Sequence, residues 1–167
     1  MDVSLSGEDI KRLLKGRCKI VTYPDLKQYK TIEDLLSPWG YCVLLYMTSA
    51  NYGHWTCIIQ HKDRIEFFDS YAMIPDTEFK EIPKEDRYKY NFHGFPYLTK
   101  LLYNSGYTIE YNHVPLQKLD DDVSTCGRHV AVRLLLRHIP LNNYLKIMTS
   151  CVDATPDDIV IDLTNNI

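Results

Sequence analysis

Runs of apolar residues, separated by polar and charged stretches, divide the chain into short strands and helices. Residues 41–47 (YCVLLYM) are apolar throughout, which predicts a strand buried on both faces. The runs 54–60 (HWTCIIQ) and 64–69 (RIEFFD) flank the polar stretch 61–63, which predicts an antiparallel hairpin. Further strands are expected at residues 18–23 and 107–114.

Capping signals mark the beginnings and ends of the expected helices. Ser6 with Asp9 opens a short helix that ends near Gly16, and Thr31 with Asp34 resembles a capping box. The other helices are expected at residues 95–104, from Thr125 to Pro140, at 141–149 and from Thr155 onward. Polar loops are expected at 48–53 and 117–124, and an irregular surface connection at the charged, proline-containing segment 72–92.

Length and composition fit an ordinary globular protein. The 167 residues suffice for one domain, taken as residues 1–167, and 45% hydrophobic with 25% charged residues is typical of such a domain. A net charge of −3 and a pI near 6.0 argue against a dominant surface for nucleic acid or anionic membrane.

The cysteines predict a reducing compartment. Their number is odd and no pair is spaced as CxxC, so free thiols are expected. The N-terminus is acidic and polar, unlike a signal peptide, and no apolar run approaches the ~20 residues of a membrane span. We therefore expect a protein of the cytosol or nucleus that is not secreted. The cysteines are Cys18, Cys42, Cys57, Cys126 and Cys151.

Cys126 stands where a polar loop ends and an apolar helix is expected to begin. Unpaired N–H groups and the macrodipole at a helix N-terminus favour the thiolate, which is the reactive form of cysteine. Gly127 adds no side chain that would obstruct a substrate backbone. A Cys-Gly pair by itself is more often structural, so the assignment of a nucleophile depends on partners elsewhere in the chain.

His54 begins one strand of the expected hairpin, and Asp69 ends the other. In an antiparallel pair the start of one strand lies beside the end of its partner, so the two side chains are expected to meet at one sheet edge. His54 would then act as general base and acid, with Asp69 orienting its ring. The alternatives are an exposed loop histidine and a simple turn acid. His129, on the helix of Cys126, is expected to be structural.

Gln117 and Trp55 complete the candidate set. The Gln117 amide, beside the N–H of Cys126, would form a two-donor oxyanion hole. Trp55, next to His54, would shield the ion pair and narrow the substrate channel, and an ordinary core position is the alternative. Neither a metal nor a cofactor is expected.

In its order, this set resembles the adenovirus-protease and SUMO-protease superfamily of cysteine peptidases. The resemblance rests on NYGHWTCII (51–59), IEFFDSYA (65–72), VPLQ (114–117) and STCGRHVAVRLL (124–135). It implies an α+β fold, in which a central helix carrying the cysteine packs on a mixed or antiparallel sheet carrying histidine and aspartate, flanked by further helices. It also implies that Cys126 is the nucleophile, His54 the base and acid, Asp69 the orienter and Gln117 an oxyanion donor.

Substrates differ within that superfamily. A compact chain is most similar to the proteases of large DNA viruses and related mobile elements, which implies a thiol endopeptidase that cleaves viral structural precursors after glycine. An isopeptidase acting on ubiquitin-like conjugates is the alternative. The expected partner is thus a protein substrate, and the resemblance implies a location in the host cytoplasm or nucleus, or in the virion. The acidic pI does not support activation by DNA, no membrane partner is expected, and a monomer is expected.

Two rivals come from other classes of protein. An acetyltransferase of the bacterial-effector type shares the His–acid–Cys order, but it needs acetyl-coenzyme A and a basic cluster. Lys84, Arg87 and Lys89 are a thin version of such a cluster, set among acids. A non-catalytic module that holds a ubiquitin-like tail would need none of the chemistry that the Cys, His, Asp and Gln set supplies.

Overall fold

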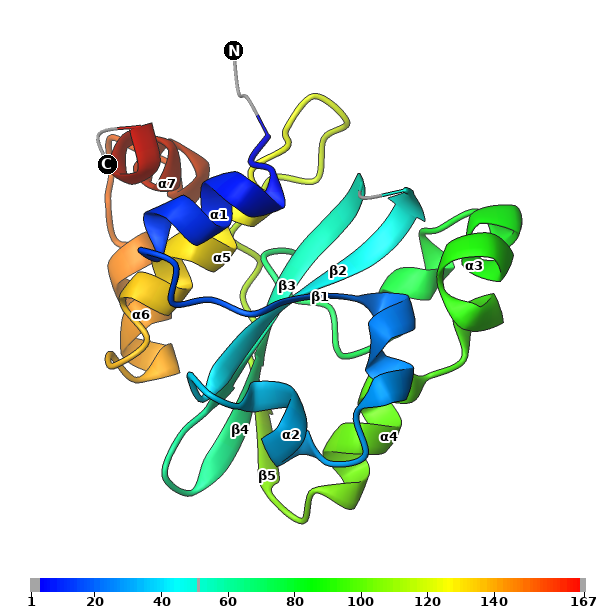
Figure 1. The fold of residues 1–167 in the computed structure, drawn as a ribbon. Helices are drawn as coiled ribbons and strands as arrows, with labels where there is room; N and C mark the ends of the chain where they lie inside the picture. The colour runs from blue at the N-terminus through cyan, green and yellow to red at the C-terminus, as the bar shows by residue number, and fades with distance from the viewer. Residues whose placement is uncertain (1–3, 51, 166–167) are drawn as a thin grey trace.

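The structure, a computed structural model, describes residues 4–50 and 52–165 and confirms the predicted α+β class. Five strands form one mixed sheet in the order β1-β2-β3-β4-β5 (Figure 1). The outer strands β1 and β5 run parallel to their neighbours, while β2, β3 and β4 are antiparallel to one another. Their bounds are Ile20–Thr22 (β1), Tyr41–Ser49 (β2), Tyr52–Gln60 (β3), Arg64–Phe68 (β4) and Thr108–Tyr111 (β5).

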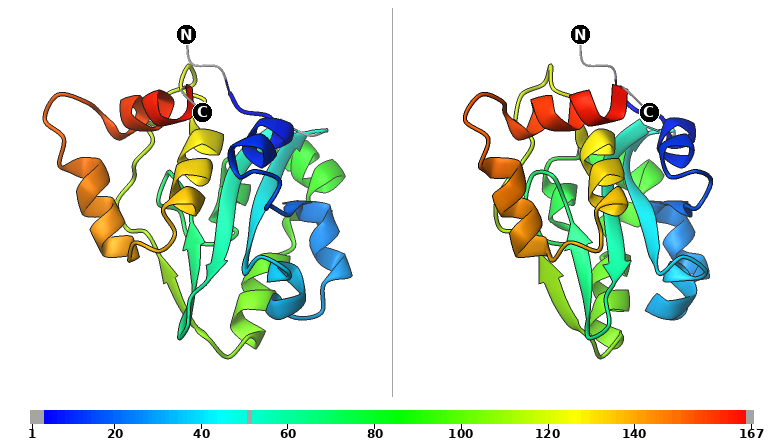
Figure 2. Two further views of the ribbon diagram at one scale, coloured as in Figure 1. Left: turned by 60° about the vertical axis from the view of Figure 1, so that its left-hand side comes forward. Right: turned by 90° about the vertical axis from the view of Figure 1, so that its left-hand side faces the viewer.

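Helices cover both faces of the sheet (Figures 1 and 2). One face is covered by α1 (Gly7–Leu13), α5 (Cys126–Leu135), α6 (Leu141–Thr149) and α7 (Pro156–Asn165). The other is covered by α2 (Ile32–Leu36), α4 (Tyr97–Asn104) and the 3₁₀ helices η1 (Tyr23–Gln28) and η2 (Thr77–Lys80). The elements α3 (Lys84–Tyr90) and η3 (Phe92–Gly94) follow η2. No helix in the described part of the chain is long and apolar enough to cross a membrane.

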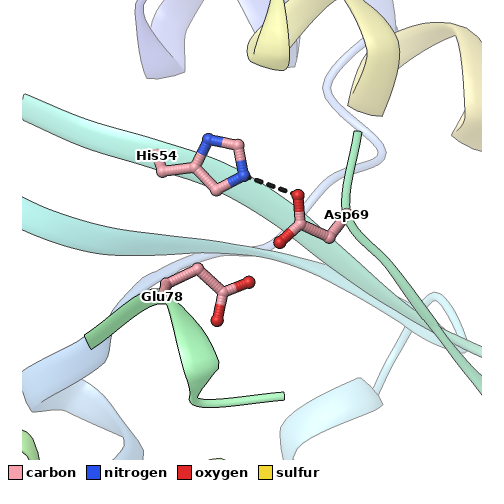
Figure 3. Close-up of side chains that lie close together, drawn as sticks. All are labelled: His54, Asp69 and Glu78. Carbon is pink, nitrogen blue, oxygen red and sulfur yellow. Dashed lines mark hydrogen bonds and ion pairs between the residues drawn. The ribbon is translucent and has the colours of Figure 1, made fainter. Parts of the chain in front are cut away.

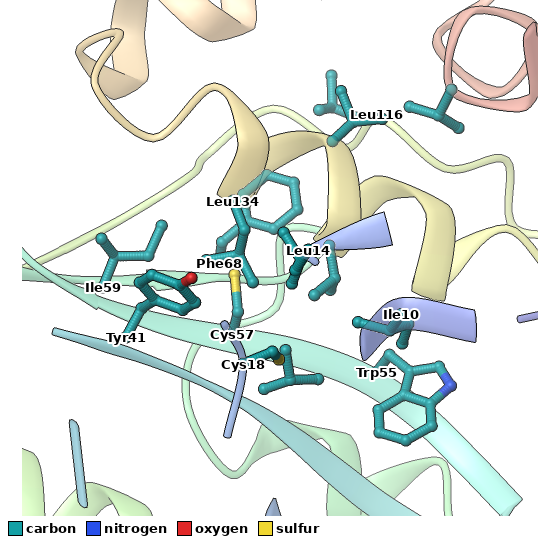
Figure 4. Close-up of a cluster of buried hydrophobic side chains, with 14 of the residues drawn as sticks. Ile10, Leu14, Cys18, Tyr41, Trp55, Cys57, Ile59, Phe68, Leu116 and Leu134 are labelled. Atoms are coloured by element: carbon teal, nitrogen blue, oxygen red, sulfur yellow. The ribbon is translucent and has the colours of Figure 1, made fainter. Parts of the chain in front are cut away.

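The continuous apolar run of β2 supplies both cores. Successive side chains of a strand point to opposite faces, so Val43 and Leu45 join the core under α5 while Cys42 and Leu44 join the core under α2 and α4. Figure 4 shows the first core, where Leu134 of α5 lies over the sheet. The helix α5 packs on this face of the sheet. Its first residue, Cys126, therefore lies at the end of the sheet where β3 begins.

The predicted loop at residues 48–53 is largely wrong. β2 extends to Ser49 and β3 begins at Tyr52; Asn51 lies outside the described residues. Gly53 makes this extension feasible, because a Cβ at that position would lie 1.8 Å from the carbonyl oxygen of Tyr46. The close approach keeps His54 opposite Tyr46 in the β2–β3 register.

The prediction that residues 72–92 form an irregular surface connection is also wrong. The segment contains η2 and α3, and it buries Glu78, Phe79 and Ile82. Phe79 packs edge-on against the rings of Tyr23 and Tyr46, so burial of apolar surface outweighs the local excess of charge.

Several predicted elements are shorter than expected. The strand at 18–23 is reduced to Ile20–Thr22, because Pro24 favours the 3₁₀ turn that follows, and the strand at 107–114 is Thr108–Tyr111. The helix that was predicted to reach Pro140 ends at Leu135. There the guanidinium of Arg133 donates to the carbonyls of Leu136 and Ile139, which satisfies acceptors that a longer helix would pair internally.

A buried ion pair ties α5 to the sheet. Arg133 donates two hydrogen bonds to the carboxylate of Glu66 on β4, at 2.8 and 2.7 Å, and both side chains are fully buried. His61 donates a third from Nε2 at 2.9 Å. This network fixes the helix that carries Cys126 relative to the strands that lead to His54 and Asp69.

Candidate active site

A groove of about 1430 Å³ lies between the N-terminal segment and the loop before α5. Its walls also include the first residues of β3 and of α5. His54, Trp55, Gln117 and Cys126 all line the groove, while Asp69 lies fully buried behind it. The structure therefore brings together all the candidate residues that the sequence singled out, although they span more than seventy positions of the chain.

Cys126 is the first residue of α5, with Thr125 as the N-cap. Cys126 is a partly exposed residue that lines the groove, whereas Cys18, Cys42 and Cys57 are buried. Burial opposes ionisation of Cys126, but the hydrogen bond and charge of His54, with backbone N–H groups of Trp55 and Gly127, outweigh it and lower the thiol pKa. All five cysteines are free.

His54 and Asp69 meet as the hairpin register predicts. The β3–β4 ladder ends at the pair Cys57 and Phe68, and Asp69 follows directly. Nε2 of His54 lies 2.8 Å from Oδ1 of Asp69 (Figure 3). A carboxylate only accepts, so Nε2 carries the hydrogen, and Nδ1, on the far side of the ring, is left for the thiol.

The electrostatics of this pair favour an ionised imidazole. Burial lowers the pKa of His54, but the charge and hydrogen bond of Asp69, and then those of Cys126, raise it well above the usual value. Burial raises the pKa of Asp69, but the charge of His54 and further hydrogen bonds bring it below the usual value. The opposite shifts of His54 and Cys126 are those of a thiolate–imidazolium pair.

Asn112, which follows β5, fixes the backbone of Asp69. The Asp69 N–H donates to Oδ1 of Asn112 at 3.1 Å, and Nδ2 of Asn112 donates back to the Asp69 carbonyl at 2.6 Å. The Tyr71 N–H donates to Oδ1 of Asp69 at 2.8 Å. These contacts hold the carboxylate toward His54 beyond the end of the β4 ladder.

Gln117 is engaged within the protein. Its Oε1 accepts from the Ser70 hydroxyl at 2.7 Å, and Nε2 donates to the Tyr71 hydroxyl and to the Val123 carbonyl, each at 3.0 Å. Tyr71 also stacks on His54, with ring centroids 4.8 Å apart. To donate to an oxyanion, the Gln117 amide must release one of these acceptors.

Trp55 is mostly a core residue. Only 8% of its surface is exposed, and its indole N–H donates to the Leu5 carbonyl at 3.2 Å. The indole also explains Gly127, because a Cβ there would lie 3.2 Å from both Trp55 Cδ1 and Leu5 Cβ. Trp55 thus forms part of the groove floor and anchors the N-terminal segment that makes one wall.

Asp157, at the start of α7, holds both ends of the loop that precedes Cys126. Its carboxylate accepts from the Lys118 N–H at 2.9 Å and from the Thr125 hydroxyl at 2.5 Å. It also accepts from Nε2 of His129 at 2.9 Å, and His129 is fully buried. His129 therefore has a structural environment, as the sequence suggests.

Sequence reasoning missed three polar residues around this site: Glu78, Asn112 and Asp157. In the sequence, Asp157 falls only within the helix expected from Thr155 onward, and Asn112 only within the strand expected at 107–114. The donor atoms of His54, Asp69 and Glu78 all lie within 4.8 Å of one another, a spacing that suits a metal ion. However, one nitrogen of His54 is bonded to Asp69 and the other serves Cys126, so we assign no metal ligand here.

Comparison with solved structures gives distant similarities. The central domain of the uncharacterized Lpg1148 protein from Legionella pneumophila matches with a TM-score of 0.44 and 15% identity, over 99% of this chain and 96% of that chain. ChlaDub1 from Chlamydia trachomatis matches with a TM-score of 0.44 and 14% identity, over 95% of this chain and 72% of that chain.

No family model matches the chain. A curated relative from the Sputnik virophage, "Uncharacterized protein V9", is 42% identical over 166 residues. The match covers 97% of this chain and 94% of the relative, so the two proteins share nearly their whole length. The chain therefore belongs to the family of this virophage protein.

Proposed function

We propose that the protein is a cysteine endopeptidase that cleaves viral structural precursors after glycine. The observation that carries this proposal is the convergence of Cys126, His54 and Asp69 on one groove, with the pKa of the thiol lowered and that of the imidazole raised. A groove that serves only to hold a peptide has no need of a buried acid that orients a histidine toward a thiol. The virophage relative supports a viral setting.

The reaction begins with attack of the Cys126 thiolate on the scissile carbonyl carbon. A C–S bond forms, and the carbonyl electron pair moves to the oxygen. Cys126 is the first residue of α5, so its own N–H has no partner within the helix and is available to the oxyanion. Gln117 supplies the second donor once its amide releases Tyr71 or Val123.

His54 moves the protons. Nδ1–H of the imidazolium protonates the amine as the C–N bond breaks, which leaves a thioester on Cys126. The neutral imidazole then takes a proton from water, whose oxygen attacks the thioester carbon and releases the thiolate and a carboxylic acid. Asp69 keeps the ring oriented through Nε2 in every step.

Glycine before the scissile bond suits the groove floor. Two aromatic side chains line the groove together with Cys126: Trp55, packed against Gly127, and Tyr71, stacked on His54. A residue without a Cβ lets the substrate backbone approach such walls at no steric cost.

The test is substrate profiling with a peptide library, run in parallel with ubiquitin-like fusions and viral precursor fragments. We expect cleavage after glycine, and complete loss of cleavage in Cys126→Ala with the fold retained. The matched control is Cys151→Ala, which removes an exposed cysteine that does not line the groove and should cleave normally.

Other outcomes point to the rivals. Preference for a bulky residue before the cut would contradict the glycine proposal. Hydrolysis of ubiquitin-like fusions alone would make the protein an isopeptidase, and transfer of acetyl groups from acetyl-coenzyme A without peptide hydrolysis would make it an acetyltransferase. Cleavage that persists in Cys126→Ala would remove the cysteine mechanism altogether.

A further inference from the structure

Three carboxylate oxygens beside the candidate triad are buried without a hydrogen-bond partner: Oδ2 of Asp69, and Oε1 and Oε2 of Glu78. Glu78 is only 3% exposed, and Asp69 is not exposed at all. Buried polar atoms without partners are rare and costly, so this concentration beside a reactive histidine requires a physical explanation.

The two oxygens of Asp69 are treated very differently. Oδ1 accepts from His54 at 2.8 Å and from the Tyr71 N–H at 2.8 Å. Oδ2 faces the carboxyl group of Glu78, which projects from η2 toward the His54–Asp69 pair (Figure 3). Two carboxylates this close, both out of water, cannot both remain ionised.

Asp76 holds Glu78 in this place. One oxygen of Asp76 accepts from the hydroxyls of Tyr23 and Tyr46, each at 2.9 Å, and the other accepts from the Thr99 N–H at 2.8 Å. Every oxygen of Asp76 is therefore satisfied, and the turn that it opens is fixed to β2 and α4. Glu78 is presented to Asp69 by a rigid support.

We propose that Glu78 is a neutral carboxylic acid whose O–H donates to Oδ2 of Asp69, and that it thereby acts as a positioning residue for His54. One proton between the two acids supplies the missing donor, keeps Asp69 ionised and directs Oδ1 at the imidazole. The inference rests on the thiol chemistry proposed above and adds a fourth member to it.

The surroundings of Glu78 agree with a neutral acid. The titratable groups that face it are Asp69 after β4, His54 on β3 and Tyr46 on β2. Burial, then the hydrogen bond and charge of Asp69, raise the pKa of Glu78 well above its usual value, and His54 opposes this only in part. Among the described residues no ion pair includes Glu78.

The direct test is the infrared spectrum of the folded protein at neutral pH. We expect the carbonyl stretch of a neutral carboxylic acid, shifted in D₂O, that disappears in Glu78→Gln and persists in Glu81→Gln. Glu81 caps the same turn but is exposed, so it is a matched control. The wild-type H₂O/D₂O comparison stands alone if Glu78→Gln fails to fold.

A second test follows alkylation of Cys126 by iodoacetamide against pH, which needs no substrate. In Glu78→Met, Oδ2 of Asp69 loses its donor, so protonation of Asp69 becomes easier and the imidazolium loses support. We expect the pH at which Cys126 begins to react to rise by about one unit. At the pH where the wild-type thiol begins to react, the variant should then be alkylated about tenfold more slowly. Glu78→Gln keeps an N–H donor for Asp69, so its alkylation rate at that pH should be close to that of the wild type.

Each outcome decides the proposal. It is overturned by a wild-type spectrum without a neutral-acid band, by a folded Glu78→Met with the wild-type alkylation profile, or by one tightly bound metal ion per chain that chelation removes. If the band and the alkylation profile are as expected but no peptide is cleaved, the Glu78–Asp69 pair stands and the endopeptidase proposal fails.

Discussion

β4 and the residue after it carry two buried carboxylates, each bonded to a histidine, yet the two groups are built for different purposes. Glu66 binds His61 at 2.9 Å, and Asp69 binds His54 at 2.8 Å. The third partner differs. Glu66 receives the bidentate guanidinium of Arg133, whereas Asp69 faces another acid.

The third partner decides whether the negative charge of the carboxylate is neutralised within the fold or is left to act on the histidine. Burial raises the pKa of Glu66, but hydrogen bonds from Arg133 and His61 more than reverse this, and the charge is compensated within the fold. Among the described residues, no arginine or lysine forms an ion pair with Asp69, whose cationic partner is protonated His54. Its charge is thus available to stabilise an imidazolium. The charge of Glu66 is therefore compensated within the fold, whereas that of Asp69 is directed at His54.

The largest effect should be a loss of activity when His54 is removed from the group around Asp69. We expect His54→Ala to lower kcat/KM for the preferred peptide by on the order of 10²–10⁴-fold, because no base and acid remains. His61→Ala is the matched control, since His61 binds the other buried carboxylate, that of Glu66, and does not line the groove. It should stay within about threefold of wild type, because it leaves the groove untouched. Equal losses in the two variants would contradict the comparison.

Changes in the group around Glu66 should instead lower the free energy of unfolding. Arg133→Met leaves Glu66 buried without its cation, so we expect the free energy of unfolding in urea to fall by about 3–5 kcal/mol. Adding Glu66→Leu removes the uncompensated charge and should restore most of that loss.

An exposed pair provides the scale for this experiment. Lys11→Gln breaks the surface contact with Glu8 and should cost less than about 1 kcal/mol. If Arg133→Met costs no more than Lys11→Gln, the buried network does not hold α5 to the sheet.

The smallest effect is a pH dependence that has opposite signs in the two groups. Glu66 has a lowered pKa, so its contribution to stability is present above the usual glutamate pKa and is lost as the pH falls through the folded value. Glu78 has a raised pKa, so the folded state retains a proton that the unfolded state releases. Stability should therefore decrease as the pH rises from about 4.3, with a slope of at most about 1.36 kcal/mol per pH unit from this group.

Urea unfolding at a series of pH values checks this sign. Subtracting the Glu78→Gln curve from the wild-type curve isolates the contribution of Glu78. A difference that increases with pH would mean that Glu78 is ionised in the fold.

The sequence predicts the parts of the site that depend on local geometry. Antiparallel pairing places His54 near Asp69 whatever the rest of the fold does, and a polar loop before an apolar run marks the helix start at Cys126. The two-sided burial of residues 41–47 follows from their unbroken apolar character. These features use neighbours in sequence or a single hairpin.

The residues that were missed depend on contacts between distant segments. Glu78 lies in a charged, proline-containing stretch that is typical of a surface loop, and only Phe79 and Ile82 hint at its burial. Asn112 reaches Asp69 across 43 positions of the chain. Such polar partners carry no periodic signal, because their role is defined by the atom that they meet and not by the pattern around them.

The contacts of the Asp157 carboxylate imply that the groove is completed late in synthesis of the chain. Lys118 and Thr125, at the two ends of the loop before Cys126, share this acceptor at the start of α7. A ribosome delivers His54, Gln117 and Cys126 before it delivers residue 157. The nascent chain thus carries its thiol in an unfinished groove, and the groove becomes complete only when α7 docks.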